Sequence, residues 1–188
     1  MKGRLKDLLD LSRGRTCFIG LGQEGHGDDG FGPRLATALA ERVSACGRSE
    51  GPRVECAGLA PERHLGALVE EGFEQVVFLD AVDFAGAPGD VLLADAARML
   101  ALYPQVSTHR LSLGLLARYL ASRGVQAFLL GVQPSSLAPG RELSPEVAGA
   151  LEALLALLAG PETRAERAPQ PSAASAGERA GSSAGVNA

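Results

Sequence analysis

Short apolar runs along the chain alternate with segments whose apolar residues recur every three or four positions. Most of these runs are too apolar to alternate with polar residues, which is typical of strands covered on both faces. Five runs are predicted to be strands: Thr16–Leu21, Arg53–Gly58, Gln75–Val82, Asp90–Asp95 and Gln126–Gln133. Because strands alternate with helices, we expect a single-domain α/β fold with a mostly parallel twisted sheet and helices on both faces, an α/β/α sandwich.

Four segments combine a helix-start signal with apolar residues at helical spacing. Proline suits the first helical position because its missing N–H would have no partner there, and Ser or Thr can cap the free N–H groups. The predicted starts are Pro33, Pro61, Ser107 or Thr108, and Ser144 followed by Pro145. The apolar faces behind them are Leu35, Leu39 and Val43; Leu65 and Leu68; Leu111, Leu115, Tyr119 and Leu120; and Val147, Leu151, Leu154, Leu155 and Leu158.

The third and fourth predicted strands are joined only by the segment DFAGAPG, residues 83–89. Neighbouring parallel strands need a crossover of a dozen or more residues, usually a helix. The fourth strand is therefore expected to run antiparallel to the third or to lie at an edge, which makes the sheet mixed.

The composition changes beyond residue 160. Residues 161–188 are rich in Ala, Ser, Gly, Pro and charged residues, and their only large apolar side chain is Val186. Such a segment cannot bury enough surface to offset the entropy of ordering it. We predict one folded domain at residues 1–160, followed by a disordered C-terminal tail at residues 161–188.

Composition and charge exclude several classes of protein. Hydrophobic residues make up 46% and charged residues 21% of the chain, and the net charge of -4 predicts no basic surface for nucleic acid or anionic lipid. No apolar run approaches the ~20 residues of a membrane-spanning helix, and no uninterrupted apolar segment indicates export. Cys17, Cys46 and Cys56 show no C-x-x-C spacing and are interpreted as buried free thiols. We expect a soluble, cytoplasmic protein.

The glycine-rich stretch IGLGQEGHGDDGFGPRLA, residues 19–36, follows the first predicted strand and permits two interpretations. Three of its glycines match the G-x-G-x-x-G spacing of a dinucleotide-binding loop. However, Asp28 and Asp29 would repel the phosphates that a helix N-terminus binds, and the glycines after them are unsuited to a first helical turn. The helix is therefore expected to begin only at Pro33, and the dinucleotide interpretation is the weaker one.

A metal site is the other interpretation. Asp28 and Asp29 follow the first strand, Asp80 ends the third with Asp83 behind it, and His109 opens a helix before the last strand. Since the carboxyl ends of parallel strands meet at one edge, these groups can converge there. One imidazole and two carboxylates form an open site suited to nickel, zinc or iron. Another interpretation stays open, in which the aspartates only cap helices or accept hydrogen bonds from loops, and His109 only donates a hydrogen bond to a buried carbonyl oxygen.

Several motifs in the same order make the chain resemble the nickel-iron hydrogenase maturation endopeptidases. They cover nearly all of residues 16–158 and are GLGQEGHGDDGFGPRLA, AGLAPERHLG, VVFLDAVDFAGAPGDV, STHRLSLGLLARYL and FLLGVQPSSL followed by LSPEV. Separated motifs that agree in order are more specific than any one of them. The segment Ala60-Pro61-Glu62 is similar to the branch that serves hydrogenase 3 or formate-hydrogenlyase-type enzymes.

The resemblance implies a metal-dependent, aspartic-type processing endopeptidase. The family removes the C-terminal extension of a nickel-iron hydrogenase large-subunit precursor after nickel insertion, with the bound nickel as recognition element. Its catalytic and metal-contacting positions fall on Asp29, Asp80 and His109. The nickel is expected to arrive with the precursor, and zinc or cadmium to substitute in vitro. Asp83 and Asp28 are the candidates for a general base, and we expect a monomer.

The glycine-rich loop departs from the family pattern at three positions. Gln23 stands where the family usually has Asn, and Glu24 and His26 replace apolar residues. His26 is interpreted as a solvent-facing residue, with an additional ligand or proton carrier as the alternative, and His64 as a surface residue. These departures keep a second hypothesis open, a non-catalytic, chaperone-like binding protein for the large subunit; a dinucleotide-binding protein is the third.

Overall fold

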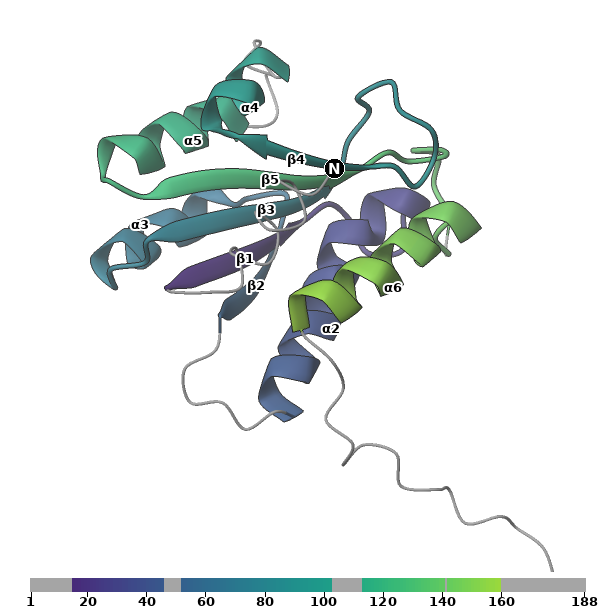
Figure 1. Ribbon diagram of the computed structural model, residues 1–188, viewed down its shortest axis with the longest axis horizontal. Helices are drawn as coiled ribbons and strands as arrows, with labels where there is room; N and C mark the ends of the chain where they lie inside the picture. Colours follow the sequence, from purple (N-terminus) through teal and green to yellow (C-terminus); the bar gives the residue numbers. More distant parts are fainter. Residues whose placement is uncertain (1–14, 46–51, 103–112, 141, 160–188) are drawn as a thin grey trace, which may run out of the picture.

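The computed structural model describes residues 15–45, 52–102, 113–140 and 142–159. Five strands form one sheet in the order β2-β1-β3-β5-β4 (Figure 1). Their bounds are β1 Thr16–Leu21, β2 Arg53–Gly58, β3 Gln75–Ala81, β4 Val91–Asp95 and β5 Gln126–Val132. All five strands predicted from the apolar runs are confirmed, because each observed boundary agrees with the prediction to within about one residue.

β4 is the antiparallel member of the sheet. β2, β1, β3 and β5 pair in parallel, whereas β4 pairs antiparallel with β5 and ends the sheet. This mixed sheet, with the fourth strand at an edge, confirms what the short DFAGAPG connection predicted. The neighbour of β4 is β5 and not β3, because β5 enters between them later in the chain.

Helices cover both faces of the sheet (Figure 1). α2 and α6 pack on one face, and α3, α4 and α5 pack on the other, which confirms the predicted α/β/α sandwich. The bounds are α2 Phe31–Ala45, α3 Glu62–Glu70, α4 Ala96–Leu102, α5 Leu113–Ser122 and α6 Pro145–Ala159, with a 3-10 helix η1 at Gly27–Gly30. Within the described residues, no helix is long and apolar enough to span a membrane.

Alternate side chains of the central strands enter opposite layers of the core. In β1, Phe18 packs with the α2 and α6 layer, whereas Cys17 and Ile19 pack with the layer of α3, α4 and α5. Every residue of β1 is buried, so the lack of polar alternation in TCFIGL follows from burial on both faces. Each large apolar side chain buried in this way contributes about 1.5–3 kcal/mol to the stability of the fold.

The predicted helix starts agree with the structure at two places and differ at a third. Pro61 immediately precedes α3, and Pro145 opens α6, as predicted. The prediction that α2 begins only at Pro33 is wrong, because Gly27–Gly30 form a 3-10 turn that leads directly into Phe31. The glycine-rich segment therefore enters the helix earlier than its composition suggests.

The buried side of α5 includes the predicted Leu120 but otherwise differs from the predicted one. Leu113, Leu116 and Leu120 are buried, whereas Tyr119 is 38% exposed. The helical period was right but its phase was not, since the same spacing starting from Leu113 also gives an apolar face, and a tyrosine hydroxyl favours the solvent side. α4 has no predicted counterpart. Ser107, Thr108, Leu111 and the predicted tail at 161–188 lie outside the described residues.

The start of α2 is wedged between the ends of β1 and β3. A Cβ on Gly32 would lie 2.2 Å from the main-chain oxygen of Leu79 and 2.3 Å from that of Leu21, so the approach requires glycine. The strands that follow β1 in the chain lie on opposite sides of it, with β2 on one side and β3 and β5 on the other. In open α/β sheets, ligands bind at such a switch point, beyond the carboxyl ends of the strands.

Candidate functional site

The loop after β1 turns back on itself at Gly22. This residue has a φ of 110°, which residues with side chains rarely adopt. A Cβ there would lie 2.0 Å from the main-chain oxygen of Asp29. The N–H of Gly22 donates to the carbonyl oxygen of Gly58, at the end of β2, at 3.1 Å. The glycine therefore lets the loop close over the strand ends and sets the position of Asp29.

Asp29 lies in η1, directly before α2, and is half-buried. Its Oδ2 accepts a hydrogen bond from the backbone N–H of Gln23 at 2.8 Å, and its own N–H donates to the carbonyl oxygen of His26 at 3.2 Å. Because Gln23 acts through its main chain, the side chain at this position does not determine the contact. Gln23, Glu24 and His26 are all exposed, so the interpretation of His26 as a solvent-facing residue is confirmed.

Asp80 is the penultimate residue of β3 and lies half-buried, opposite Gly131 of β5. Because α2 begins against the end of β3, η1 and Asp29 lie over the same edge of the sheet as Asp80. The fold thus places these two aspartates at the carboxyl ends of adjacent parallel strands, Asp29 in the segment after β1 and Asp80 in the last residues of β3. His109, the third predicted ligand, lies outside the described residues, and the three-residue site stays a prediction.

The described part of the chain adds no alternative metal site. Within it, no three His, Cys, Asp or Glu side chains lie close enough together to hold a metal ion. Two hollows of about 360 Å³ each occur away from Asp29 and Asp80. One lies between α3 and α5, and the other lies beside the junction of β4 and α4.

Asp28, the neighbour of Asp29, has a different environment. It is only 2% exposed and contacts the β5–α6 loop, residues 133–140 and 142–144. Its carboxylate accepts hydrogen bonds from the N–H groups of Ser135 (2.8 Å), Ser136 (3.3 Å) and Ser144 (2.7 Å) and from the Ser144 hydroxyl (3.0 Å). Asp28 therefore fastens this loop to the loop after β1. Sequence reasoning missed this role, because only the fold brings residues so distant in the chain together.

The same hydrogen bonds decide the charge of Asp28. Burial by itself raises the pKa of a carboxyl group, because the charged form loses water. The hydrogen bonds from Ser144, Ser135 and Ser136 outweigh burial and hold the pKa of Asp28 below its ordinary value. A carboxylate with four donors and a lowered pKa is a weak proton acceptor. The structure therefore disfavours Asp28 as general base and favours a role in holding the loop.

Gln133 is a second buried polar side chain, and it fixes the loop after β3. It is 7% exposed. Its Oε1 accepts hydrogen bonds from the N–H groups of Phe84 (2.9 Å) and Gly86 (3.0 Å), and its Nε2 donates to Asp83 (3.1 Å). The hydrogen bonds from the N–H of Ala85 and from Gln133 lower the pKa of Asp83, which makes it a weak base as well. The sequence feature that could have indicated this role of Gln133 is its place as a polar residue directly after an apolar strand.

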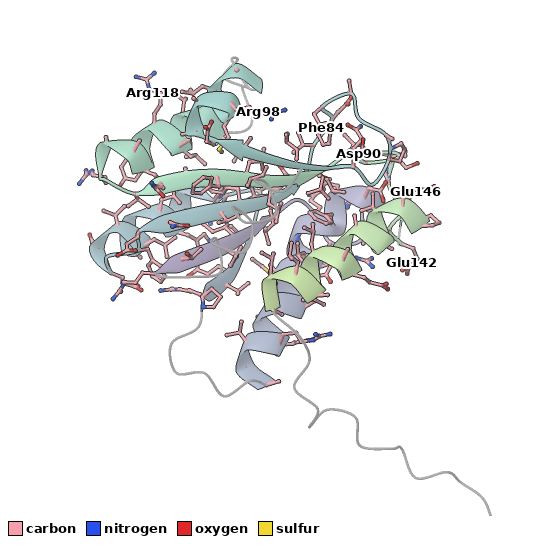
Figure 2. The ribbon with its side chains drawn as sticks, viewed as in Figure 1. Phe84, Asp90, Arg98, Arg118, Glu142 and Glu146 are labelled. Atoms are coloured by element: carbon pink, nitrogen blue, oxygen red, sulfur yellow. The ribbon has the colours of Figure 1, made fainter. Side chains whose placement is uncertain are left out.

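The loop after β3 also meets the start of α6. A Cβ on Gly89 would lie 2.7 Å from the main-chain oxygen of Glu146, and the N–H of Gly89 donates to the carbonyl oxygen of Gln133 at 2.9 Å. Figure 2 shows Phe84 and Asp90 of this loop on the same side of the molecule as Glu146. The loops after β1, β3 and β5 therefore form one connected edge.

His64 is more than a surface residue. Its Nδ1 contacts the carboxylate of Glu55, which also pairs with Arg53. The Glu55 side chain is 14% exposed. The prediction placed His64 at the surface, where its side chain is 33% exposed, but did not include this partner. The dinucleotide interpretation needs an acidic residue in β2 that is free to bind a ribose, and Glu55 is already engaged by two side chains.

The cysteines differ in their environment. Cys17 is buried, and burial raises the pKa of its thiol to about 12, which keeps it in the unreactive protonated form. Cys56 is exposed, so the prediction of buried thiols is wrong for this residue. It lies in β2, an edge strand of the sheet, where fewer residues cover it. Cys46 lies outside the described residues.

Comparison with protein families identifies the class. The model of the hydrogenase maturation protease family matches residues 34–160. The match includes Asp80 and the position of His109 and begins after Asp29. It covers most of the chain, and the protein therefore belongs to the hydrogenase maturation protease family, a family of hydrolases. The resemblance drawn from the motifs is confirmed.

Individual relatives agree with this assignment. The chain is similar to the NiFe hydrogenase maturation protease HycI from Thermococcus kodakarensis, with a TM-score of 0.70 and 31% identity over 83% of this chain and 96% of that one. The hydrogenase maturating endopeptidase HybD of Escherichia coli gives a TM-score of 0.61 and 26% identity over 76% and 88%. In sequence, the chain is 29% identical over 108 residues to the hydrogenase 3 maturation protease of Escherichia coli, over 57% of this chain and 65% of that protein.

Proposed function

We propose that this protein is an endopeptidase that removes the C-terminal extension of a nickel-iron hydrogenase large-subunit precursor after nickel insertion. Membership of the hydrogenase maturation protease family supports hydrolysis of a hydrogenase precursor. The finer proposal rests on the position of Asp29 and Asp80, which lie at the carboxyl ends of two adjacent parallel strands, at the switch point of the sheet. An open α/β sheet binds its substrate at that edge.

In this proposal the nickel is part of the substrate. It arrives in the immature active centre of the precursor and is recognised by Asp29, Asp80 and His109, whose carboxylate and imidazole groups suit this ion. Zinc or cadmium is expected to substitute in vitro. A metal ion at a scissile bond polarises the carbonyl or lowers the pKa of a water molecule.

The protein's own residues supply a prepared binding edge. Asp29 is anchored by the N–H of Gln23, and Asp80 belongs to β3, which is paired on both sides by β1 and β5. Groups that are held in place before binding need not be ordered during the reaction. Asp28 and Asp83 are engaged in hydrogen bonds and are not proposed as the general base.

The deciding experiment compares a nickel-loaded with a nickel-free large-subunit precursor from the same organism. Each is incubated with the purified protein, and the mass of the processed subunit is measured. Loss of a C-terminal peptide only from the loaded precursor supports both hydrolysis and nickel-dependent recognition. Cleavage of both forms overturns the nickel dependence, and cleavage of neither overturns the proposed peptidase activity.

Three variants test the proposed residues. Asp29→Asn, Asp80→Asn and His109→Ala are each expected to slow cleavage by about 100-fold or more, since even indirect supports of a metal ligand are worth 10–100-fold. Their melting temperatures should stay close to that of the unchanged protein. Glu24→Gln is the matched control, because it removes an exposed carboxylate from the same loop. Full activity of the Asp29 and Asp80 variants would refute the site.

A chaperone-like protein that binds the large subunit without cutting it is the second candidate. The observation behind it is the exposed set Gln23, Glu24 and His26, which departs from the family pattern in the loop next to Asp29. A nickel-loaded precursor that binds tightly and remains intact would favour this candidate over the peptidase.

A further inference from the structure

The β5–α6 loop is clamped from its inner side by residues next to Asp29. The Asp28 carboxylate accepts hydrogen bonds from the N–H of Ser135, at the beginning of the loop, and from the N–H of Ser144, at its end. A buried carboxylate that bridges both ends of a loop restricts the loop more than a single contact would, because the loop cannot open at one end without leaving donors unpaired.

Further contacts support the same clamp. The N–H of Gly27 donates to the carbonyl oxygen of Gly140, and a Cβ on Gly27 would lie 3.1 Å from the main-chain oxygen of Ala138. Arg34 of α2 pairs with Glu142 at 3.6 Å. The inner side of the loop thus contacts η1 and the start of α2 on either side of Asp29.

The outer side of the same loop is exposed and carries an apolar side chain. Residues 135–140 are all exposed, and Leu137, at 55%, is the most exposed large hydrophobic side chain of the described residues. A single exposed leucine needs no explanation by itself. Here, however, the loop that carries it is held at Ser135, Ser136 and Ser144 by the buried carboxylate of Asp28, the neighbour of Asp29.

We infer that Leu137 is a docking contact for the precursor segment next to the cleavage site, and that Asp28 is the positioning residue that holds this contact in place. The inference rests on the proposed function. Its occupant is an extended stretch of the precursor polypeptide that presents an apolar side chain. A chain bound across Asp29 and Asp80 must leave the site over a neighbouring loop, and the β5–α6 loop is fastened directly to the loop of Asp29.

The proposed contact uses an ordered loop for a physical reason. Association loses affinity when a flexible surface must be ordered on binding. A loop that is already clamped presents Leu137 without that loss. Disruption of the clamp should therefore weaken binding of the precursor even though Asp28 never touches it.

The test measures kcat and KM on the nickel-loaded precursor for Leu137→Ala, Asp28→Asn and the double variant. Leu137→Ala is expected to raise KM about 10-fold, the loss for one leucine contact, with kcat and the melting temperature unchanged. Asp28→Asn is expected to raise KM to a similar extent. Because both act on one contact, the double variant should be no worse than Asp28→Asn alone.

A matched control and a milder variant complete the design. Leu100→Ala removes a leucine that is 37% exposed on α4, which follows the end of β4 at the opposite edge of the sheet, and should leave KM unchanged. If Asp28→Asn does not fold, Ser144→Ala replaces it. This variant removes one hydroxyl donor to Asp28 and keeps the N–H donor, so it should give a smaller rise in KM.

Each other result overturns the inference. An unchanged KM in Leu137→Ala excludes the docking contact, and additive effects in the double variant exclude the clamp as the route. A lower kcat at constant KM in Asp28→Asn, with one limb of the pH–rate profile lost, identifies Asp28 as a base. Failure of the unchanged protein to cut the precursor is a failure of the proposed function. In that event, weaker precursor binding by Leu137→Ala, measured by calorimetry, still supports the docking contact, and equal binding overturns it.

Discussion

The carboxyl edge of the sheet, where its parallel strands end, and the amino edge, where they begin, are stabilised by different kinds of polar interaction. At the carboxyl edge, Asp28 and Gln133 are buried and satisfy main-chain groups of two loops, those after β3 and β5. At the amino edge, Arg53 and Glu71 form a partly exposed pair, and Arg53 lies over the ring of Phe73 at 5.9 Å. A buried donor that loses its partner costs about 1–3 kcal/mol, whereas an exposed ion pair contributes about 0–1 kcal/mol.

This difference shows where the molecule requires particular side chains. The amino edge tolerates the loss of one charge, because solvent replaces the lost partner. The carboxyl edge does not, because its donors face the protein interior and lie beside Asp29. The edge that carries the proposed site is therefore the one whose geometry depends on single residues.

Gly32→Ala should break the carboxyl edge most severely. The new Cβ would meet two main-chain oxygens, those of Leu79 and Leu21, so α2 must move away from β1 and β3. We expect a loss of about 3 kcal/mol in the free energy of unfolding, measured by urea denaturation. Gly149→Ala on α6 is the matched control, because nothing lies near its Cβ. It should be neutral or stabilising by up to about 1 kcal/mol, and an equal loss in both variants would contradict the prediction.

Asp28→Ala should have the next largest effect. The change leaves the N–H groups of Ser135, Ser136 and Ser144 without their acceptor. The expected loss is about 2–3 kcal/mol, again from urea denaturation. Asp83→Ala provides the comparison, because Asp83 is exposed and solvent can replace it, so its loss should be clearly smaller. Equal losses would show that burial does not separate the two carboxylates.

The contribution of Asp28 should also depend on pH. Its folded-state pKa lies below the ordinary value of 3.8, so folding favours the charged form. The stabilisation is therefore fully present above that value and is lost as the pH falls through the lower folded pKa. The measurement compares the unfolding free energies of the unchanged protein and Asp28→Asn from neutral pH to about pH 2. The difference should be constant at first and narrow in acid, and a difference that widens in acid would contradict the assignment.

The fold was largely predictable because its signals are local. Apolar runs located all five strands, and a proline after a serine located the start of α6. The short DFAGAPG segment indicated an antiparallel edge strand. Errors arose where two phases of one helical period were both apolar, as in α5, and where a 3-10 turn of glycines and aspartates led into α2.

The site was predictable only in part, because its supports are distant in the chain. Asp29 and Asp80 could be placed at one edge, since the carboxyl ends of parallel strands coincide. Nothing local to Asp28 indicates that it binds Ser144, more than a hundred residues away. Its proximity to Asp29 favoured a chemical role, and only its hydrogen bonds to the β5–α6 loop show the structural one.

Arg53→Ala should have the smallest effect and tests the amino edge. The change removes the pairs with Glu55 and Glu71, but Glu55 keeps its contact with His64 and the carboxylate of Glu71 is open to solvent. We expect a loss of less than about 1 kcal/mol that disappears in about 1 M salt, because salt screens exposed charges. The loss in Asp28→Ala should persist at the same salt concentration, since hydrogen bonds to a buried carboxylate are screened much less. Equal salt sensitivity in the two variants would remove the distinction between the two edges.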